Sequence, residues 1–470
     1  MATVAGVDSS TQSCKVVLCD ADTGEILEEA RAPHPEGTEV PAESWWQAMC
    51  SAGHGLLDRA DAVAVAGQQH GLVALGADGR PVRDALLWND IRSADAAAEL
   101  IAELGGPQVW ADAVGSVPLA AFTVAKLRWL ADHEPEHADR THRVLLPHDY
   151  LTWRLRGGPS DRSVEPTTDR GDASGTGYWS PATGAYHKDI LAQAFRGRTP
   201  ELPRVAAPAE AVGRTPAGAL VAAGTGDNAG AALGLGIEDG DVVMSLGTSG
   251  TVYTRAAAPS ADATGAIAGF ADATGAFLPL VCTLNAARVL DSTAALLGVG
   301  PTALETLARQ APPGAEGVVL LPYLSGERTP NLPHTTGSLH GLRPETLRPS
   351  HIARAAFEGM LCNMADALDH LRATGIPIQR MLLIGGAARS ALVAELAAEI
   401  IGVTVTVPEP NEYVALGAAR QAAWALARTA RPPSWSARTV AEVRAPGDGG
   451  VIGRRIRAQY ESARGALYAR

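Results

Sequence analysis

Short apolar runs that end at glycines or polar turns recur along the chain. Residues 3–31 predict three strands, TVAGVD, KVVLCD and EILEEAR, separated by the turns SSTQS and DADTG. Residues 241–255 repeat the opening hairpin as DVVMSLG, a turn of Thr248, Ser249 and Gly250, and TVYTR. With a boundary near Gly240, two halves of similar length open alike. This predicts two duplicated domains, residues 1–240 and 241–470, around a central cleft.

Other apolar runs have no polar interruption before they reach glycine. They are residues 61–71, 219–230 and 381–390. Runs of this kind suit strands that are buried on both faces of a sheet. Alanine-rich stretches at 350–373 and 413–428 predict helices, and segments rich in turn-forming residues at 157–177 and 430–450 predict loops. The pattern therefore predicts an α/β fold.

The composition and net charge argue against some classes of function. The chain has 470 residues, of which 46% are hydrophobic and 19% charged, typical of a globular protein with at least two domains. The 39 Lys and Arg and 51 Asp and Glu give a net charge of 39 − 51 = −12, without a dense basic block. This argues against binding to nucleic acid or to an anionic membrane.

Signals for export, membrane insertion and metal binding by cysteine or histidine are weak. The amino terminus, MATVAGVDSS, lacks the basic and apolar regions of a signal peptide, and we see no run of 18 apolar residues. The five cysteines form no C-x-x-C pair, and the twelve histidines have no metal-ligand spacing. We expect reduced thiols in a cytoplasmic protein.

The first hairpin has the chemistry of a phosphate site. Its turn, SSTQS, includes Thr11 and offers hydroxyls and closely spaced backbone N–H groups, which form anion-binding nests. Asp8 ends the preceding strand, where a carboxylate can hold Mg2+, directly or through water. Lys15 follows the turn and can neutralise phosphate charge. The alternative for this segment alone is a polar β-turn beside an exposed lysine.

The second hairpin supplies Gly247 and Thr248 at the matching position. Two such turns in matched halves favour a shared phosphate ligand, and neither a P-loop nor a strand-linked dinucleotide fingerprint is present. The segment LIGGAARS places Gly385, Gly386 and Ala387 between a strand and a helix. This turn can offer flat backbone to adenine, or it can be a tight strand-to-helix connection.

A candidate catalytic carboxylate lies in GTGDNAGAALG. Asp227 follows an apolar strand among glycines that leave room for a substrate. Phosphoryl transfer to an alcohol needs a carboxylate that accepts the hydroxyl proton. Asn228 can exchange hydrogen bonds with a polyol. The alternative is that Asp227 caps the following helix.

Polar residues after other strands are candidates for sugar recognition. Gln69 and His70 end the strand AVAVAGQQHG and carry the paired donors and acceptors that read hydroxyls, although a single histidine there is usually structural. Trp88 can stack on a sugar face. In YLSGERTP, Glu327 and Arg328 predict a hinge or cleft-wall element.

These segments, taken in order, resemble the FGGY carbohydrate kinases of the actin/hexokinase-like (ribonuclease H-like) fold. The strings are VDSSTQSCK, AGQQHG, LLWNDIR, LLPHDYL, GTGDNAGAALG, SLGTSG, LPYLSGERTP and LIGGAARS. Each string alone is weak, but their order along nearly the whole chain is specific. The resemblance implies ATP- and Mg2+-dependent phosphorylation of a ketopentose, D-xylulose, to D-xylulose 5-phosphate.

The resemblance also assigns roles to residues. Asp227 is the expected base, and Asp8 organises the metal and phosphates as the second catalytic carboxylate. The expected sugar contacts are Gln69, His70, Asp227 and Asn228. The expected ATP contacts are Thr11, Lys15, Gly247, Thr248, Gly385, Gly386 and Ala387. Ser10, Gln69 and Ala387 depart from residues that are common in the family (Gly, Met and Gly), but none removes a catalytic group.

Other functions remain open at this point. A related kinase acting on ribulose, gluconate or glycerol has the same catalytic residues. A non-catalytic sugar or nucleotide sensor is expected to have lost Asp8 or Asp227, and the chain retains both. An actin-like filament protein is the third alternative. The family resemblance allows a homodimer, which the composition neither supports nor opposes.

Overall fold

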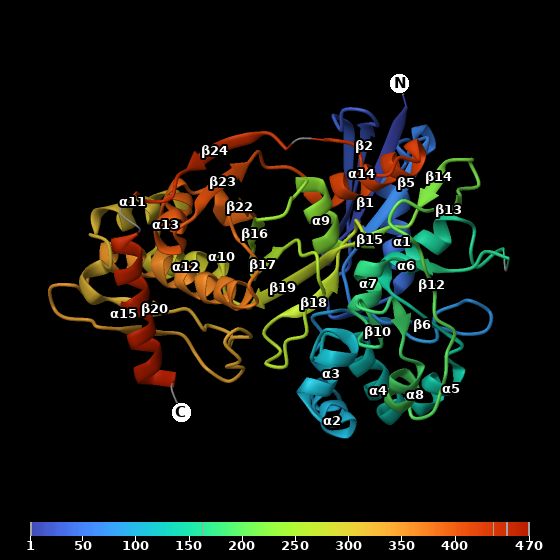
Figure 1. Ribbon diagram of the computed structural model, residues 1–470, viewed down its shortest axis with the longest axis horizontal. Coiled ribbons are helices and arrows are strands. Elements are labelled where there is room, and N and C mark those ends of the chain that lie inside the picture. Colours follow the sequence, from blue (N-terminus) through green and yellow to red (C-terminus); the bar gives the residue numbers. More distant parts are fainter. Residues whose placement is uncertain (1, 162, 436, 448–449, 469–470) are drawn as a thin grey trace. The chain divides into compact units, whose positions relative to one another are not determined.

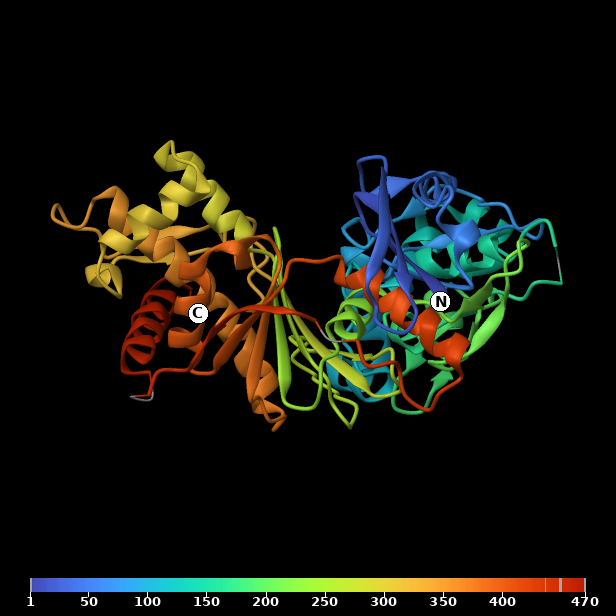
Figure 2. The same cartoon turned by 90° about the horizontal axis from the view of Figure 1, so that it is seen from above.

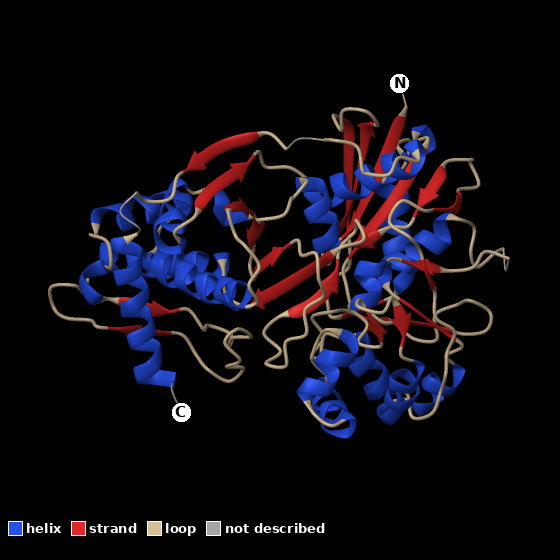
Figure 3. Cartoon of the chain, viewed as in Figure 1, coloured by secondary structure: helices blue, strands red, loops and turns tan. Residues whose placement is uncertain are grey.

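A computed structural model describes residues 2–161, 163–435, 437–447 and 450–468. The chain forms two compact units, each assembled from segments that are separated in sequence. The first unit comprises residues 1–237, 256–278 and 411–437, and the second comprises residues 238–255, 279–410 and 438–470. Helices accompany a large sheet in each unit (Figure 3).

The main sheet of the first unit has the order β13-β14-β5-β1-β2-β3, and β15 pairs with the end of β5 (Figure 1). Its strands are β1 (Thr3–Ser9), β2 (Ser13–Asp20), β3 (Ile26–Pro33), β5 (Ala62–Gly67), β13 (Ala211–Arg214), β14 (Leu220–Ala222) and β15 (Thr225–Gly226). β1 is parallel to β5 and antiparallel to β2. Every residue of β5 is buried, which explains its uninterrupted apolar run.

Most of the first unit outside this sheet is inserted between β5 and β13. The helices of the unit are α1 (Ala42–Ala52), α2 (Ala94–Leu104), α3 (Pro107–Val114), α4 (Thr123–His133), α5 (Pro135–Arg140), α6 (Pro147–Leu155), α7 (Arg170–Ser174), α8 (Lys188–Ala194), α9 (Asp227–Leu235) and α14 (Tyr413–Ala427). Its shorter strands are β4 (Glu39–Val40), β6 (Val73–Leu75), β7 (Ala85–Leu86), β8 (Arg143–Leu145), β9 (Thr167–Thr168), β10 (Trp179–Ser180), β11 (Ala185–Tyr186), β12 (Arg204–Val205) and β18 (Ala268–Ala271).

Helix α14 comes from the C-terminal part of the chain but packs against β1 and α9 of the first unit (Figures 1 and 2). The approach is backbone to backbone. A Cβ atom on Gly6 would lie 1.9 Å from the carbonyl oxygen of Ala415, and one on Gly417 would lie 1.8 Å from that of Gly230. Only glycine fits at these two positions. The close packing of α14 therefore depends on a glycine in β1 and on a glycine in α14 itself.

The main sheet of the second unit repeats this arrangement. Its strands β19-β17-β16-β22-β23-β24 match β3-β2-β1-β5-β14-β13 in order and in direction. They are β16 (Asp241–Leu246), β17 (Gly250–Thr254), β19 (Phe277–Thr283), β22 (Arg380–Ile384), β23 (Thr404–Pro408) and β24 (Thr439–Val443). The predicted duplication of an α/β domain is therefore confirmed.

The remaining elements of the second unit are mostly helical. They are α10 (Ala287–Leu297), α11 (Pro301–Gln310), α12 (Pro349–Ala373), α13 (Ala391–Ile401), α15 (Val451–Tyr468) and the paired strands β20 (Val319–Leu321) and β21 (Ser338–His340). The helices predicted at 350–373 and 413–428 are confirmed as α12 and α14.

The two loop predictions are only partly right. The segment 157–177 contains β9 and α7, and the segment 430–450 contains β24, while residues 162, 436, 448 and 449 lie outside the described residues. The polar composition of these segments did not indicate the short elements, because tertiary contacts rather than intrinsic secondary-structure propensity stabilise them. Within the described residues, we find no helix that is both long and apolar enough to span a membrane.

Candidate active site

Three neighbouring strands of the first unit end side by side. In the parallel register, Asp8 of β1 and Thr225 of β15 both pair with Ala66 of β5. The residues that follow β5 and β15 are therefore carried to the edge where β1 ends. Carboxyl ends of parallel strands are the usual ligand-binding edge of α/β sheets. The structure thus brings Asp8, Gln69, His70, Asp227 and Asn228 to one edge.

Asp8 is a buried carboxylate in an unusual electrostatic setting. It is 4% exposed, and its Oδ1 atom has no hydrogen-bond partner among the described residues. Burial raises the pKa of Asp8 to about 7, the cation of Lys15 opposes this rise, and the negative charge of Asp227 adds to it. A buried oxygen without a donor, next to a second carboxylate, fits a bound cation or its water ligand.

The first hairpin tip is held by contacts that sequence reasoning did not anticipate. Lys15 lies opposite Asp8 across the hairpin, with its Nζ atom 4.0 Å from Asp8 Oδ2 and 2.5 Å from Glu412 Oε2. Thr11 accepts a hydrogen bond of 2.9 Å from Trp88 Nε1. Trp88 therefore joins its own loop to the turn of the first hairpin, and Glu412 at the start of α14 holds the lysine.

Asp227 is the first residue of α9 but does not cap it. Gly226 is the capping residue, and Oδ1 of Asp227 accepts hydrogen bonds from the backbone N–H of Asn228 at 2.7 Å and from its Nδ2 at 2.8 Å. Burial raises the pKa of Asp227 to about 6, and the two bonds from Asn228 oppose that rise. The carboxylate is thus oriented by its neighbour and close to the pKa of an effective base near neutral pH.

Gln69 and His70 are both buried and both anchored to the α7 segment. Gln69 Nε2 donates to the Gly171 carbonyl at 3.1 Å, and His70 Nδ1 lies 2.6 Å from the carbonyl oxygen of Gly175. The backbone of His70 is left-handed, with φ of 68°, and its ring centroid lies 4.7 Å from that of Phe122. Such a conformation is uncommon for a residue other than glycine and is concentrated at functional sites.

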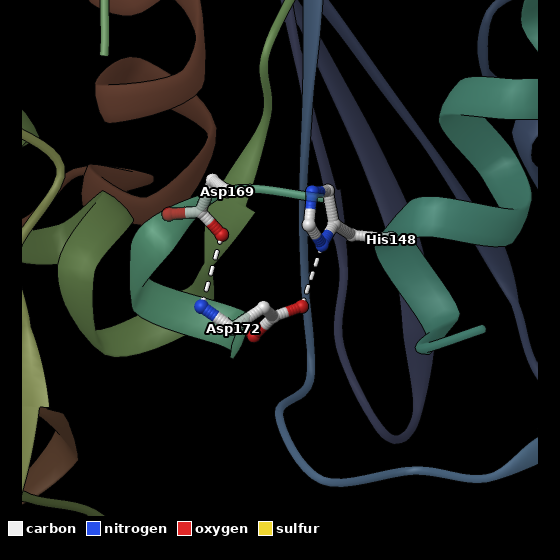
Figure 4. A group of neighbouring side chains, drawn as sticks. All are labelled: His148, Asp169 and Asp172. Carbon is white, nitrogen blue, oxygen red and sulfur yellow. Dashed lines mark hydrogen bonds and ion pairs between the residues drawn. The ribbon is translucent and has the colours of Figure 1, made fainter. Parts of the chain in front are cut away.

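A buried ionic network lies between α6, α7 and β15, and it was not identified from the sequence. His148 comes from α6, Asp169 precedes α7, and Asp172 lies within α7 (Figure 4). His148 Nδ1 lies 2.5 Å from Asp172 Oδ2, and Asp149 Oδ1 lies 3.2 Å from the same nitrogen. Asp169 Oδ2 accepts a bond from Thr225. The network connects α6 and α7 with the strand that leads to Asp227.

The charges of this network explain its protonation. Burial opposes a charge on His148, but the carboxylates of Asp172 and Asp149 outweigh it and raise the histidine pKa to about 10. Burial raises the pKa of Asp172 to about 7. One nitrogen or oxygen atom from each of His148, Asp169 and Asp172 lies within 4.8 Å of the others, close enough to be considered as a metal site. The 2.5 Å contact between His148 and Asp172 is that of a hydrogen-bonded ion pair, so we interpret the group instead as a charge network around an imidazolium.

The sequence offered only indirect signals for this network. His148 and Asp149 lie in LLPHDYL, and Asp169 and Asp172 lie in a segment that we predicted as a loop. An Asp-x-x-Asp pair among small residues was the available clue. It did not identify His148 as the partner, because that contact depends on tertiary structure.

The second unit brings the other predicted ATP residues together. The turn with Gly247 and the exposed Thr248 follows β16, and the turn Gly385 to Ala387 follows the parallel neighbour β22. Gly385 has φ of +93°, and a Cβ atom there would lie 2.6 Å from backbone atoms of Leu246. The two turns therefore lie against each other at the carboxyl ends of adjacent strands.

The chain matches two family models in succession. Residues 3–242 match the N-terminal domain of the FGGY family of carbohydrate kinases, and residues 242–426 match its C-terminal domain. Together these ranges include every predicted site residue.

Curated relatives and solved structures agree with this match. A xylulose kinase of Streptomyces coelicolor is 49% identical over 437 residues, which cover 89% of this chain and 87% of the relative. A xylulose kinase of Escherichia coli is 36% identical over 447 residues, covering 89% of each chain. The crystal structure of xylulose kinase from Bifidobacterium adolescentis has a TM-score of 0.90 at 41% identity and 99% coverage of both chains.

Proposed function

Because the chain belongs to the FGGY family of carbohydrate kinases, we propose that it transfers a phosphoryl group from ATP to D-xylulose, which gives D-xylulose 5-phosphate. The observation that carries the choice of sugar is the 49% identity to a xylulose kinase over most of both chains. The observation that supports the chemistry is the position of Asp227 beside Asp8, at the edge that also carries Gln69 and His70.

Asp227 acts as the general base in this proposal. Its Oδ1 atom is held by Asn228, which fixes the plane of the carboxylate. As the sugar hydroxyl attacks the γ-phosphorus, its proton passes to the carboxylate, the bond to the β-phosphate oxygen breaks, and ADP leaves. General-base catalysis of this kind contributes roughly 100- to 10,000-fold to the rate.

The sugar binds between Asp227 and the residues that follow β5. Gln69 and His70 present their side chains from a strand end that is fixed by carbonyls of the α7 segment. Asn228 adds a side-chain amide next to the base. These groups supply the paired donors and acceptors that hydroxyls require. The aromatic ring of Phe122 against His70 holds the imidazole in place.

Asp8 holds Mg2+ in this proposal, through its oxygen that lacks a hydrogen-bond donor. When bound, Mg2+ neutralises charge on the phosphates during transfer. Thr11 and Lys15 contact the phosphates from the first hairpin, and Lys15 exchanges Glu412 for a phosphate oxygen.

Two turns of the second unit are the other proposed nucleotide contacts. Gly247 and Thr248 contact the phosphates, and Gly385, Gly386 and Ala387 form the turn on which the adenosine rests. In this proposal the sugar residues, first hairpin and base belong to a domain of residues 1–240. The second hairpin and adenosine turn belong to a domain of residues 241–470.

The test is ADP release with ATP and Mg2+, measured with D-xylulose, D-ribulose, L-ribulose, glycerol, gluconate and no sugar. We expect D-xylulose to give the strongest stimulation and Asp227→Asn to lose nearly all turnover while ADP still binds. Stronger stimulation by another polyol would move the specificity to that polyol. No stimulation by any of them, with ADP still bound, would favour a sensor. Turnover of a tenth or more by Asp227→Asn would remove the base assignment.

Two finer points belong to the same proposal. The first is that the protein forms a homodimer, which rests on the family resemblance. Light scattering on the purified protein tests it. The second is a cytoplasmic location, because the reaction uses ATP and the five cysteines are free thiols.

A further inference from the structure

Glu327 is a buried carboxylate in the second unit that accepts four hydrogen bonds. It is 1% exposed. Its Oε1 atom accepts the backbone N–H groups of Leu284 at 2.6 Å and Arg328 at 2.8 Å. Its Oε2 atom accepts Nδ2 of Asn285 at 3.0 Å and Nδ2 of Asn363 at 2.9 Å. A carboxylate offers about four acceptor positions, so this set of donors uses its full capacity.

These contacts tie the Glu327 loop to the segment that precedes α10. Asn285 Nδ2 also donates to the Gly326 carbonyl at 2.7 Å. Thr329 Oγ1 donates to the carbonyl of Cys282, at the end of β19, at 3.1 Å. The residues 282–285 are therefore fixed from several sides by one short loop.

The same segment continues directly into contacts with the second phosphate turn. The backbone N–H of Ala286 donates to the Thr248 carbonyl at 3.2 Å, and that of Ala287 donates to the Gly247 carbonyl at 2.8 Å. One short backbone segment, residues 284–287, is thus hydrogen-bonded at its start to the Glu327 carboxylate and at its end to this turn.

The direction of these bonds matters for anion binding. In a trans peptide the C=O and the following N–H point in opposite directions. Anchoring the carbonyls of Gly247 and Thr248 to α10 therefore turns the N–H groups of Thr248 and Ser249 away from it. Adjacent N–H groups that face the same side form a nest for phosphate oxygens.

We propose that Glu327 is a positioning residue for the second phosphate turn, and that the N–H groups of Thr248 and Ser249 are the phosphate donors that it orients. This inference rests on the proposed function, because it takes the turn as a nucleotide-phosphate site. It gives Glu327, one of the charged pair in LSGERTP, a role that the sequence left open between a hinge and a cleft wall.

The test compares Glu327→Gln, Thr248→Pro, the double variant and Glu358→Gln. Proline has no backbone N–H, so Thr248→Pro removes one of the two proposed donors. Glu327→Gln keeps the shape of the side chain but replaces one acceptor oxygen with an N–H donor, which then faces two other N–H groups. Glu358 is a matched control, because it is also a buried glutamate of the second unit. It pairs with Arg354 and the Gly314 N–H, and neither partner belongs to the turn.

We expect Glu327→Gln to raise KM for ATP and Kd for ADP about tenfold while KM for D-xylulose changes less than about twofold, since only one ligand's site is disturbed. Glu358→Gln should lower Tm without this nucleotide effect. In the Thr248→Pro background the change at 327 should cost less than in the wild type, because one of the donors that Glu327 orients is already lost and residues that act on one turn are not additive.

The outcomes distinguish a failure of the proposed ATP site from a failure of the positioning role of Glu327. If Thr248→Pro leaves Kd for ADP unchanged, the phosphate turn is misassigned and the ATP part of the proposed function fails with it. If Thr248→Pro weakens ADP binding but Glu327→Gln does not, or does so no more than Glu358→Gln, the positioning role is overturned. Should Glu327→Gln not fold, Asn285→Ala carries the same test, because it removes two contacts of the path.

Discussion

The side-chain amide of Gln421 pairs with both backbone groups of Gly224. Oε1 of the glutamine accepts the glycine N–H at 2.9 Å, and Nε2 donates to the glycine carbonyl at 3.0 Å. The two residues are 197 positions apart in sequence, and Gly224 lies just before β15, which leads to Asp227. Helix α14 therefore holds the strand that delivers the proposed base.

We expect Gln421→Met to destabilise the protein and to reduce turnover. Methionine keeps the volume but leaves the N–H and C=O of Gly224 buried without partners, at about 1–3 kcal/mol for each group. Displacement of the strand before Asp227 should lower kcat more than it changes KM for ATP. Urea denaturation and steady-state kinetics measure both effects.

The matched control is Gln310→Met, at an exposed glutamine at the end of α11. It should change stability by less than about 0.5 kcal/mol, as surface substitutions usually do. Equal stability of Gln421→Met and the wild type would contradict the anchoring role of this amide.

Much of the fold follows from local pattern. The hairpins at Asp8 and at Gly247 were predicted because polar turns interrupt apolar strands. The fully buried β5 was predicted because a strand covered on both faces needs an uninterrupted apolar run. The repeat of the hairpin then predicted the duplication, which the matching strand orders confirm.

The parts that were missed depend on contacts between distant segments. No local pattern links Gln421 to Gly224 or Lys15 to Glu412, because these pairs form only when α14 returns to the first unit. The His148 network was missed for a related reason. Its members are spread over two segments, and burial of their charges becomes visible only in three dimensions.

Gly385→Ala should lower the stability of the second unit. The added Cβ would lie 2.6 Å from the backbone of Leu246, and φ of +93° is unfavourable for any residue other than glycine. Backbone strain of this kind costs about 1–3 kcal/mol before the steric clash is added. Thermal unfolding measures the loss. Gly386→Ala is the stability control, because its Cβ would meet no atom within 4 Å, and an equal Tm loss in both variants would argue against the clash.

Replacement of His148 should reveal whether its charge supports the fold. In His148→Gln the carboxylates of Asp149, Asp169 and Asp172 lose their buried cation, and breaking a buried pair in this way costs about 3–5 kcal/mol. His148→Lys keeps a cation and should lose less. Chemical denaturation at pH 7, where the histidine pKa of about 10 keeps it charged, measures the difference. The exposed His54→Gln is the control, and equal losses for Gln and Lys would contradict a role of charge.

The pH dependence of the reaction should identify Asp227 as the base. Burial raises its pKa from 3.8 to about 6, and only the deprotonated form can accept the hydroxyl proton. Activity is therefore present above this pKa and lost as the pH falls through it, about tenfold for each pH unit below. The measurement is kcat/KM for D-xylulose between pH 5 and 8 at saturating ATP and Mg2+, over a range in which the fold is verified by circular dichroism.

A second variant assigns the acid limb of this profile. Asp8 also has a raised pKa, so the limb alone does not distinguish the two carboxylates. Asn228→Ala removes the Nδ2 bond to Asp227 Oδ1, which lowers the pKa of that carboxyl. Asn228 is not one of the groups that shift the pKa of Asp8. We expect the limb to move to higher pH in Asn228→Ala and to stay in place in the exposed Asn331→Ala. A limb that is unmoved in both variants would assign the titration to another group and remove the support that the raised pKa gives to Asp227.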